Sequence, residues 1–318
     1  MIDLSLVMPC TKRKRNGTGH TLDFHKLPTL CPDVLAREWL RASSEYNHVP
    51  ARDLYCGAGW TSSLRAYEAA CRVATTRLRI ISAGYGLVTL DQLLPLYNAT
   101  FASETNQVGR RVQMAGNLSQ RHSAWWGAIN AARGSSASPL ADTLSDSACV
   151  MVAVGRNYFD AIEHDLLQLQ NHLGPGQLWI ISTGVPTLPA LQPSLLPLSA
   201  RIEYTLPGPR ATLSQRVSEW LLREIIPEVG WDRVQIKRHL QQAERAADLR
   251  EVKPKRDKST DQEVEFWIMA QLFTVPQKSV SSLLADYRAS GQACEANRFR
   301  RLCDGARSQA SLSRKMRA

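Results

Sequence analysis

The chain has 318 residues, 44% of them hydrophobic, and a formal net charge of +10 at pH 7. This length favours two domains, because a single hydrophobic core commonly stops growing below it. No apolar run approaches the ~18 residues of a membrane span, and the first basic cluster follows the first apolar stretch, which is the wrong order for a secretory signal. We therefore expect a cytoplasmic protein without a membrane partner.

The seven cysteines are an odd number, and none of them forms a C-x-x-C pair. Both a disulfide framework and a zinc knuckle are therefore unexpected. The sequence predicts a protein that works without a metal ion and without an organic cofactor.

Short apolar runs rich in β-branched residues indicate buried strands at 4–8, 78–82, 150–154 and 178–182. Helical patterns lie between and after them, at about 33–42, 57–75, 123–133, 156–173 and 212–225. This alternation is typical of an α/β fold, a mostly parallel sheet with helices on both faces. We assign residues 1–230 to this domain, expect it to be catalytic, and expect its small, polar stretch 131–147 to be a surface loop.

Residues 231–318 are predicted to form a small, basic, all-α domain. A helical pattern at 231–249 precedes a charged linker that contains proline, and three more helical patterns follow at 261–273, 279–290 and 295–308. The short, glycine-containing break at residues 290–292 favours a helix-turn-helix-like arrangement.

The positive charge is concentrated in this C-terminal part. Residues 1–232 carry 21 Lys and Arg against 19 Asp and Glu, whereas residues 233–318 carry 18 against 10. Such asymmetry favours a polyanionic partner, and we expect DNA. The predicted contacts are Lys253, Lys255, Arg256, Arg298, Arg300 and Arg301. The alternative is a solvated basic helix that only caps the domain.

The first predicted strand leads into Met8-Pro9-Cys10-Thr11-Lys12-Arg13-Lys14. Ligands collect at the carboxyl ends of parallel strands, and neighbouring cations favour a thiolate, so Cys10 is a candidate nucleophile. Lys12 and Lys14 are candidates for holding a phosphate. The alternative is that Cys10 is a small core residue.

The segment after this cluster, Asn16-Gly17-Thr18-Gly19-His20, would let backbone amides approach an anion. His20 or His25 is a candidate acid–base partner of Cys10. Asp53, which precedes a predicted helix, is a candidate for capping that helix or orienting a lysine.

A second cluster follows the strand at 78–82. Ser82, Gly84, Tyr85 and Gly86 suggest a tight loop whose backbone comes near a ligand, and Tyr97 and Asn98 come soon after. We predict that these six residues bind substrate or phosphate.

Taken in chain order, the segments 9–12, 51–55, 82–87 and 95–100 resemble a bacterial and phage domain family. It is related to YaaA, the peroxide-stress protein, and more distantly to the amidation domain of archaeosine synthase. The resemblance covers about the first 110 residues. Asn98 stands where relatives often have aspartate, and Gly84 where they usually have lysine or arginine, so an acid–base group and a cation of the pattern are missing.

The resemblance implies nucleic-acid chemistry, a DNA-protection or phage-defence setting with partner proteins, and involvement in 7-deazaguanine modification. A thiolate attacks a nitrile well. The leading hypothesis is therefore an enzyme that converts a nitrile-bearing 7-deazaguanine in DNA to an amide or amidine-type product. Cys10 would be the nucleophile, Lys12 and Lys14 would hold phosphate, and Asp53 and His20 would manage protons.

Two alternatives stay open. A base-excising or base-exchanging glycosidase would need a catalytic carboxylate, for which Asp53 and Asp91 are the best candidates. A non-catalytic DNA-binding protein of stress or phage defence would instead grip phosphate through its C-terminal helices. A metal-dependent nuclease is not expected, because the acidic residues at 160, 163 and 165 look like an exposed helix face.

Overall fold

The computed structural model describes residues 2–15, 20–102, 104–247 and 257–315. They fall into two units, Met1–Arg250 and Glu251–Ala318, which are considered separately. The helix α9 (Arg233–Ala247) belongs to the first unit, because Ile236, Leu240 and Ala243 are buried in its core. The sequence predicted a division at residue 230, but the division comes after α9.

The first unit is built on a six-stranded sheet with the order β10-β9-β8-β1-β4-β5. Its pairs are parallel except for the antiparallel pair of β4 with β5, which confirms the predicted α/β class. The strands are β1 (Ile2–Pro9), β4 (Ala74–Ser82), β5 (Gly86–Val88), β8 (Cys149–Val154), β9 (Leu178–Ser182) and β10 (Leu195–Pro197).

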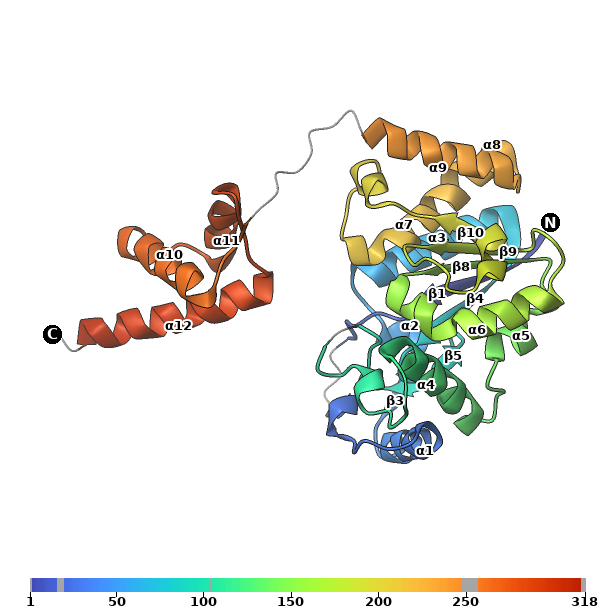
Figure 1. The fold of residues 1–318 in the computed structure, drawn as a ribbon, viewed down its shortest axis with the longest axis horizontal. Helices are drawn as coiled ribbons and strands as arrows, with labels where there is room; N and C mark the ends of the chain where they lie inside the picture. Colours follow the sequence, from blue (N-terminus) through green and yellow to red (C-terminus); the bar gives the residue numbers. More distant parts are fainter. Residues whose placement is uncertain (1, 16–19, 103, 248–256, 316–318) are drawn as a thin grey trace. The chain divides into compact units, whose positions relative to one another are not determined.

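Helices cover both faces of this sheet (Figure 1). Alternate strand residues enter different cores, because successive side chains of a strand point to opposite faces. Val150, Val152 and Val154 pack with α1 (Pro32–Ser43), α4 (Leu118–Ala132), α5 (Pro139–Leu144) and α6 (Arg156–His172). Met151 and Ala153 pack with α3 (Ala58–Val73), α7 (Leu213–Trp220) and α9. All six β8 side chains are therefore buried, which explains the continuous apolar run in the sequence.

Six helices of the first unit lie close to the predicted ranges, whereas the three short ones at 51–54, 139–144 and 226–229 are not predicted by the sequence. Those of the first unit are α1 (Pro32–Ser43), α2 (Ala51–Leu54), α3 (Ala58–Val73), α4 (Leu118–Ala132), α5 (Pro139–Leu144), α6 (Arg156–His172), α7 (Leu213–Trp220), α8 (Ile226–Val229) and α9. Short strands pair outside the main sheet, β2 (Leu22–Asp23) with β7 (Tyr97–Asn98) and β3 (His48–Pro50) with β6 (Leu93–Pro95).

Two expectations for this unit are wrong. The stretch 131–147 contains α5, whose Leu140 and Leu144 are buried, so it is not only a surface loop. Glu163 and Asp165 are also buried. Asp165 accepts hydrogen bonds from the indole of Trp126 and from the first amides of α5. Glu163 accepts from Thr187 and Leu188. Each carboxylate therefore holds a segment that is distant from it in the sequence.

The second unit contains α10 (Asp261–Thr274), α11 (Val280–Ala289) and α12 (Ala296–Lys315), with a short parallel pair of β11 (Asp257–Lys258) and β12 (Gln292–Ala293). Its own core includes Val264, Ile268, Tyr287 and Phe299. A capping box begins α10, since Thr260 and Glu263 each bond to the other's backbone amide.

No helix in the described part of the chain is both long and apolar enough to span a membrane. Among the same residues, no three His, Cys, Asp or Glu side chains gather in a way that could hold a metal ion.

His122 on α4 provides a test of this core. Its side chain is buried against Phe101, with the ring centroids 5.1 Å apart, and burial lowers its pKa to about 4. The unfolded chain takes up a proton near the ordinary pKa of about 6.5, so acidification favours unfolding between these two values.

We expect the free energy of unfolding to fall by about 2 kcal/mol from this residue between about pH 7 and pH 4.5. His122→Asn should remove that part of the pH dependence, as measured by urea unfolding across this range. His164→Asn is the matched control, because His164 is exposed on α6. Equal pH profiles for wild type and His122→Asn would contradict the assignment.

Candidate functional site

Three neighbouring strands end at the same edge of the sheet and supply the central residues of the site. Cys10 follows β1, Ser82 ends β4, and Tyr158 lies in the first turn of α6, which follows β8. β1 pairs with both β4 and β8 in parallel register. The sequence correctly predicts that Cys10 and Ser82 lie at the carboxyl edge of the sheet.

Cys10 is nearly enclosed, with 5% of its surface exposed. Its backbone amide donates to the Ile81 carbonyl at 2.8 Å, which continues the ladder between β1 and β4. Its sulfur lies 3.2 Å from the Tyr158 hydroxyl. The thiol is therefore buried against a phenol and differs from a cysteine packed only among aliphatic groups.

Lys14 is the cation beside this thiol. Its Nζ donates to the Thr11 carbonyl at 3.2 Å and lies 4.0 Å from the centre of the Tyr97 ring. Burial lowers the pKa of Lys14, and the neighbouring sulfurs of Cys10 and Cys56 partly oppose that shift. An amine with a lowered pKa can exchange a proton more readily near neutral pH.

The segment that carries Lys14 is fixed by backbone contacts. Arg15 N donates to Leu54 O at 2.8 Å, and Cys56 N donates to Arg13 O at 3.1 Å. These bonds bring the segment against Tyr55, with which Lys14 forms an antiparallel bridge.

A chain of buried hydroxyl groups links Ser82, Tyr97 and Tyr55. The Ser82 and Tyr97 oxygens are 2.7 Å apart, and those of Tyr97 and Tyr55 are 2.9 Å apart. Ser82 Oγ also accepts from the amides of Tyr85 at 3.0 Å and Gly84 at 3.3 Å.

These contacts fix the direction of the hydrogen bonds. A hydroxyl oxygen has two acceptor sites, and both sites of Ser82 are taken by amides, so its own hydrogen goes to Tyr97. Tyr97 cannot return its hydrogen to Ser82, so that hydrogen is free for Tyr55, 2.9 Å away. When Tyr97 donates to Tyr55, the hydrogen of Tyr55 is available to another acceptor.

The three phenols around the thiol remain protonated. Burial, and after it the charge of Cys10, raises the pKa of Tyr55, Tyr97 and Tyr158. They can therefore donate hydrogen bonds to a sulfur or to an anionic intermediate, but they are poor general bases near neutral pH.

The backbone carbonyl groups of the loop after β4 form their hydrogen bonds with side chains of the protein itself. The carbonyls of Ala83 and Gly84 accept from the indoles of Trp125 and Trp39 at 2.7 and 2.8 Å, and the Tyr85 carbonyl accepts from Arg133.

The two glycines of this loop are required by internal packing. A Cβ at Gly84 would lie 2.7 Å from the Tyr97 ring, and one at Gly86, where φ is +67°, would collide with Asn130. The sequence predicts that a ligand comes close to this loop. In the structure, the side chains that lie against the two glycines are those of Tyr97 and Asn130.

A hollow of about 20 Å³ opens beside Lys14. By volume it holds little more than one water molecule. Lys12 and Glu104 line it and form an ion pair of 2.6 Å. Asn98 also lines it, but its amide is bound to Asp23 at 2.7 Å. Lys12 and Asn98 thus belong to the rim, whereas Lys14 is the lysine that reaches the thiol cluster.

Other predicted residues are not joined to the cluster by any contact among the described residues. Asp53 and His20 are exposed. His25 bonds to Asn106 at 2.9 Å, and Asp91 forms an exposed ion pair with Arg52. Residues 16–19 of the predicted anion-binding segment lie outside the described residues.

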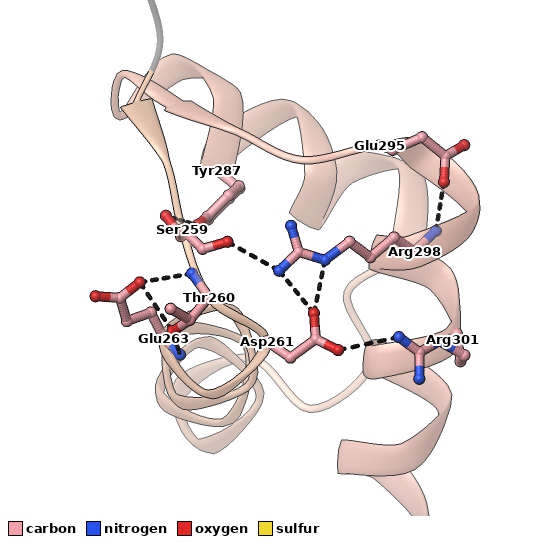
Figure 2. A network of polar contacts seen from close by, with 8 residues as sticks. All are labelled: Ser259, Thr260, Asp261, Glu263, Tyr287, Glu295, Arg298 and Arg301. Atoms are coloured by element: carbon pink, nitrogen blue, oxygen red, sulfur yellow. Dashed lines mark hydrogen bonds and ion pairs between the residues drawn. The ribbon is translucent and has the colours of Figure 1, made fainter.

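The predicted DNA contacts of the second unit divide into three groups. Arg298 and Arg301 both bind Asp261, at 2.6 and 3.0 Å, and Arg298 also donates to the Ser259 carbonyl (Figure 2). They therefore join the start of α10 to α12. Arg300 is exposed, and Lys253, Lys255 and Arg256 lie outside the described residues.

The division after α9 also changes which part of the chain carries the excess positive charge. Residues 257–308, which include all the side chains buried in the core of the second unit, contain 7 Lys and Arg and 7 Asp and Glu and are formally neutral. The excess lies on either side, with 8 basic and 3 acidic residues at 233–256 and 3 basic residues at 309–318. The charge asymmetry of the sequence therefore comes from these flanking stretches and not from residues 257–308.

The fold and the site define an α/β protein with a buried cysteine, lysine and phenol cluster at the carboxyl edge of its sheet. Comparison of the chain with protein-family models, curated proteins and solved structures finds no match.

Sequence reasoning missed two parts of the cluster. Tyr55 falls within one of the segments behind the resemblance, but its sequence context indicates no role, and Tyr158 reads as one residue of a helix. The available signal for Tyr158 is its position just after a buried parallel strand, as for Cys10 and Ser82.

Gly84→Ala tests the close packing on which the hydroxyl chain depends. We expect the added methyl group to displace Tyr97 and to cost about 1–3 kcal/mol of unfolding free energy, because the contact is with a buried ring. Chemical denaturation measures the change. Gly127→Ala on α4 is the control, since its Cβ would meet only ordinary contacts and a helical alanine is neutral or stabilising. A Gly84→Ala variant as stable as wild type would contradict this packing.

Arg298→Ala and Arg300→Ala should differ in stability. Removing Arg298 breaks its bonds to Asp261 and Ser259, so the thermal midpoint of the second unit should fall. Removing Arg300, which lies two residues further along α12 and is exposed, should leave that midpoint unchanged. Differential scanning calorimetry of the full chain reports both midpoints, and an equal response of the two variants would refute the structural role of Arg298.

Proposed function

We propose that this protein is a nucleic-acid base-modifying enzyme that uses Cys10 as a nucleophile on a nitrile-bearing 7-deazaguanine. The observation that carries the proposal is the contact of the Cys10 sulfur with the Tyr158 hydroxyl, beside a lysine whose pKa burial has lowered. Such a cluster supplies a nucleophile, a hydrogen-bond donor and a proton donor in one place.

The first step forms a carbon–sulfur bond. The Cys10 thiolate adds to the nitrile carbon, the electron pair of the broken π bond moves to nitrogen, and nitrogen takes a proton from the Lys14 ammonium. The product is a thioimidate joined to Cys10, and Lys14 is left as a neutral amine.

Water completes the reaction. Its oxygen bonds to the same carbon, and one of its hydrogens passes to the imine nitrogen. The carbon–sulfur bond then breaks, the remaining hydroxyl proton returns to Lys14, and the amide leaves a thiolate that accepts from Tyr158. Attack by ammonia in place of water gives the amidine.

The neutral phenols support the anionic stages. Tyr158 is in hydrogen-bond contact with the sulfur, and Tyr55 ends the hydroxyl chain, with its hydrogen free when Tyr97 donates to it. Donors held in place before the reaction stabilise developing charge without having to reorganise.

A base must first be extruded from its strand. Because the hollow beside Lys14 is small, admission of a base requires the Lys12–Glu104 pair at its rim to separate. In this proposal a backbone phosphate replaces Glu104 as the partner of Lys12, while the basic stretches 233–256 and 309–318 attract the polyanion.

The alternatives have less support. The carboxylates available to a glycosidase, Asp53 and Asp91, are exposed and make no described contact with the cluster. A non-catalytic DNA-binding role would leave the polar surroundings of Cys10 unused.

Cys10→Ala is the direct test. Amide formation from DNA that contains a cyano-deazaguanine should be lost, as measured by mass spectrometry of the released nucleosides. Cys149→Ala is the matched control, because Cys149 is equally buried but lies at the opposite end of the parallel strands, where burial raises its pKa to about 12. Tyr158→Phe should lower kcat about 10- to 100-fold with little change in KM.

Each of the other outcomes would contradict the proposal or indicate a different function. Full turnover by Cys10→Ala would refute the thiolate mechanism. Release of a free base by wild type and by Cys10→Ala would indicate a glycosidase. Salt-sensitive DNA binding by wild type without any turnover would indicate a binding protein.

A further inference from the structure

The helix α10 has two apolar faces on opposite sides. Val264, Ile268 and Leu272 recur at helical spacing and are buried in the core of the second unit. Phe266, Met269 and Phe273 also recur at helical spacing, about half a turn away, and are 77%, 48% and 91% exposed. A helix that needs only one partner face rarely places two phenylalanines in water.

The exposed face is nearly symmetric about its centre. Phe266 lies three residues before Met269, and Phe273 lies three residues after Ala270. The two rings are therefore about 10 Å apart along the helix, with the centre between Met269 and Ala270. If two such helices pack antiparallel about a two-fold axis at this centre, Phe266 of each meets Phe273 of the other, and the small Ala270 allows close approach.

The area of the face suits a self-association. From the exposed fractions, the three large side chains present roughly 400–500 Å² of surface, so a symmetric pair would bury close to 1,000 Å² in total. That value is at the lower end for a specific interface, which indicates a dimer that dissociates on dilution.

The ends of the helix are compatible with this orientation. Its first turn is acidic, with Asp261 and Glu263, and its last turn carries no acidic residue. An antiparallel pair places the acidic amino end of each helix beside the uncharged carboxyl end of the other, so like charges do not face each other.

We propose that the face formed by Phe266, Met269, Ala270 and Phe273 binds the same face of a second copy of this chain, with the two α10 helices antiparallel. This inference does not depend on the proposed enzymatic function.

Sedimentation equilibrium of the full chain over about a hundredfold range of concentration tests the proposal. Wild type should pass from monomer to dimer. Phe273→Glu and Phe266→Glu should each weaken dimerisation about 30-fold or more, because each removes a large apolar anchor. Both side chains are exposed, so circular dichroism should show both variants folded. Val275→Glu is the matched control, since Val275 is an exposed apolar residue just beyond the helix and outside the face.

The orientation has its own measurement. In the antiparallel pair Met269 lies next to the two-fold axis, so Met269→Cys should be joined to itself in the dimer by a short thiol crosslinker. Asn297→Cys, exposed on α12, should not exceed the background that wild type gives through its exposed Cys31 and Cys71.

Three outcomes would overturn the proposal. A wild type that stays monomeric at all concentrations has no such interface. A dimer that persists in both phenylalanine variants uses another surface. A monomer in which Phe273→Glu increases protease cleavage at residues 248–256 would show that the first unit of the same chain occupies this face.

Discussion

The arrangement of the site depends on one constraint: the loop after β4 is buried, and every polar group in it needs a partner inside the protein. Trp125, Trp39 and Arg133 bond to three consecutive carbonyls, and Ser82 accepts from two of its amides. Because both acceptor sites of Ser82 are occupied, its hydroxyl hydrogen points to Tyr97. The hydrogen of Tyr97 is then free for Tyr55. A structural requirement of the loop thereby produces a directed chain of donors beside Cys10.

The same burial determines which charges the site holds. Phenols enclosed near a sulfur keep their protons, whereas an enclosed ammonium group loses its proton more easily. Lys14 therefore gives up its proton more readily than a lysine in solvent. Lys12, which differs from it by two positions in the chain, stays in an exposed ion pair. Two lysines that look equivalent in the sequence thus have different chemistry, because one is under the Tyr97 ring and the other is in solvent.

In the second unit, too, residues that look alike in the sequence have different roles in the structure. Arg298 and Arg301 are both held by Asp261 across the bundle, so one of their two positive charges is balanced locally. Among the described residues its distinctive outward feature is the apolar face of α10, whereas the excess positive charge of the sequence lies on either side of residues 257–308. The arginines that stabilise this unit and its exposed apolar side chains are therefore different groups of residues.

The sequence alone determined four strands of the main sheet, the main helices and the α/β class, because buried parallel strands and amphipathic helices have periodicities that are local properties of the chain. It did not predict the short strands β5 and β10 at the two edges of that sheet. It also placed Cys10 and Ser82 at one edge, since strands that run parallel end together. It could not determine that Tyr158 meets Cys10, that Glu163 and Asp165 are buried, or that α9 joins the first unit. Those outcomes depend on contacts between residues far apart in the chain, such as the 148 positions that separate Cys10 from Tyr158, and only the packing of the tertiary structure decided them.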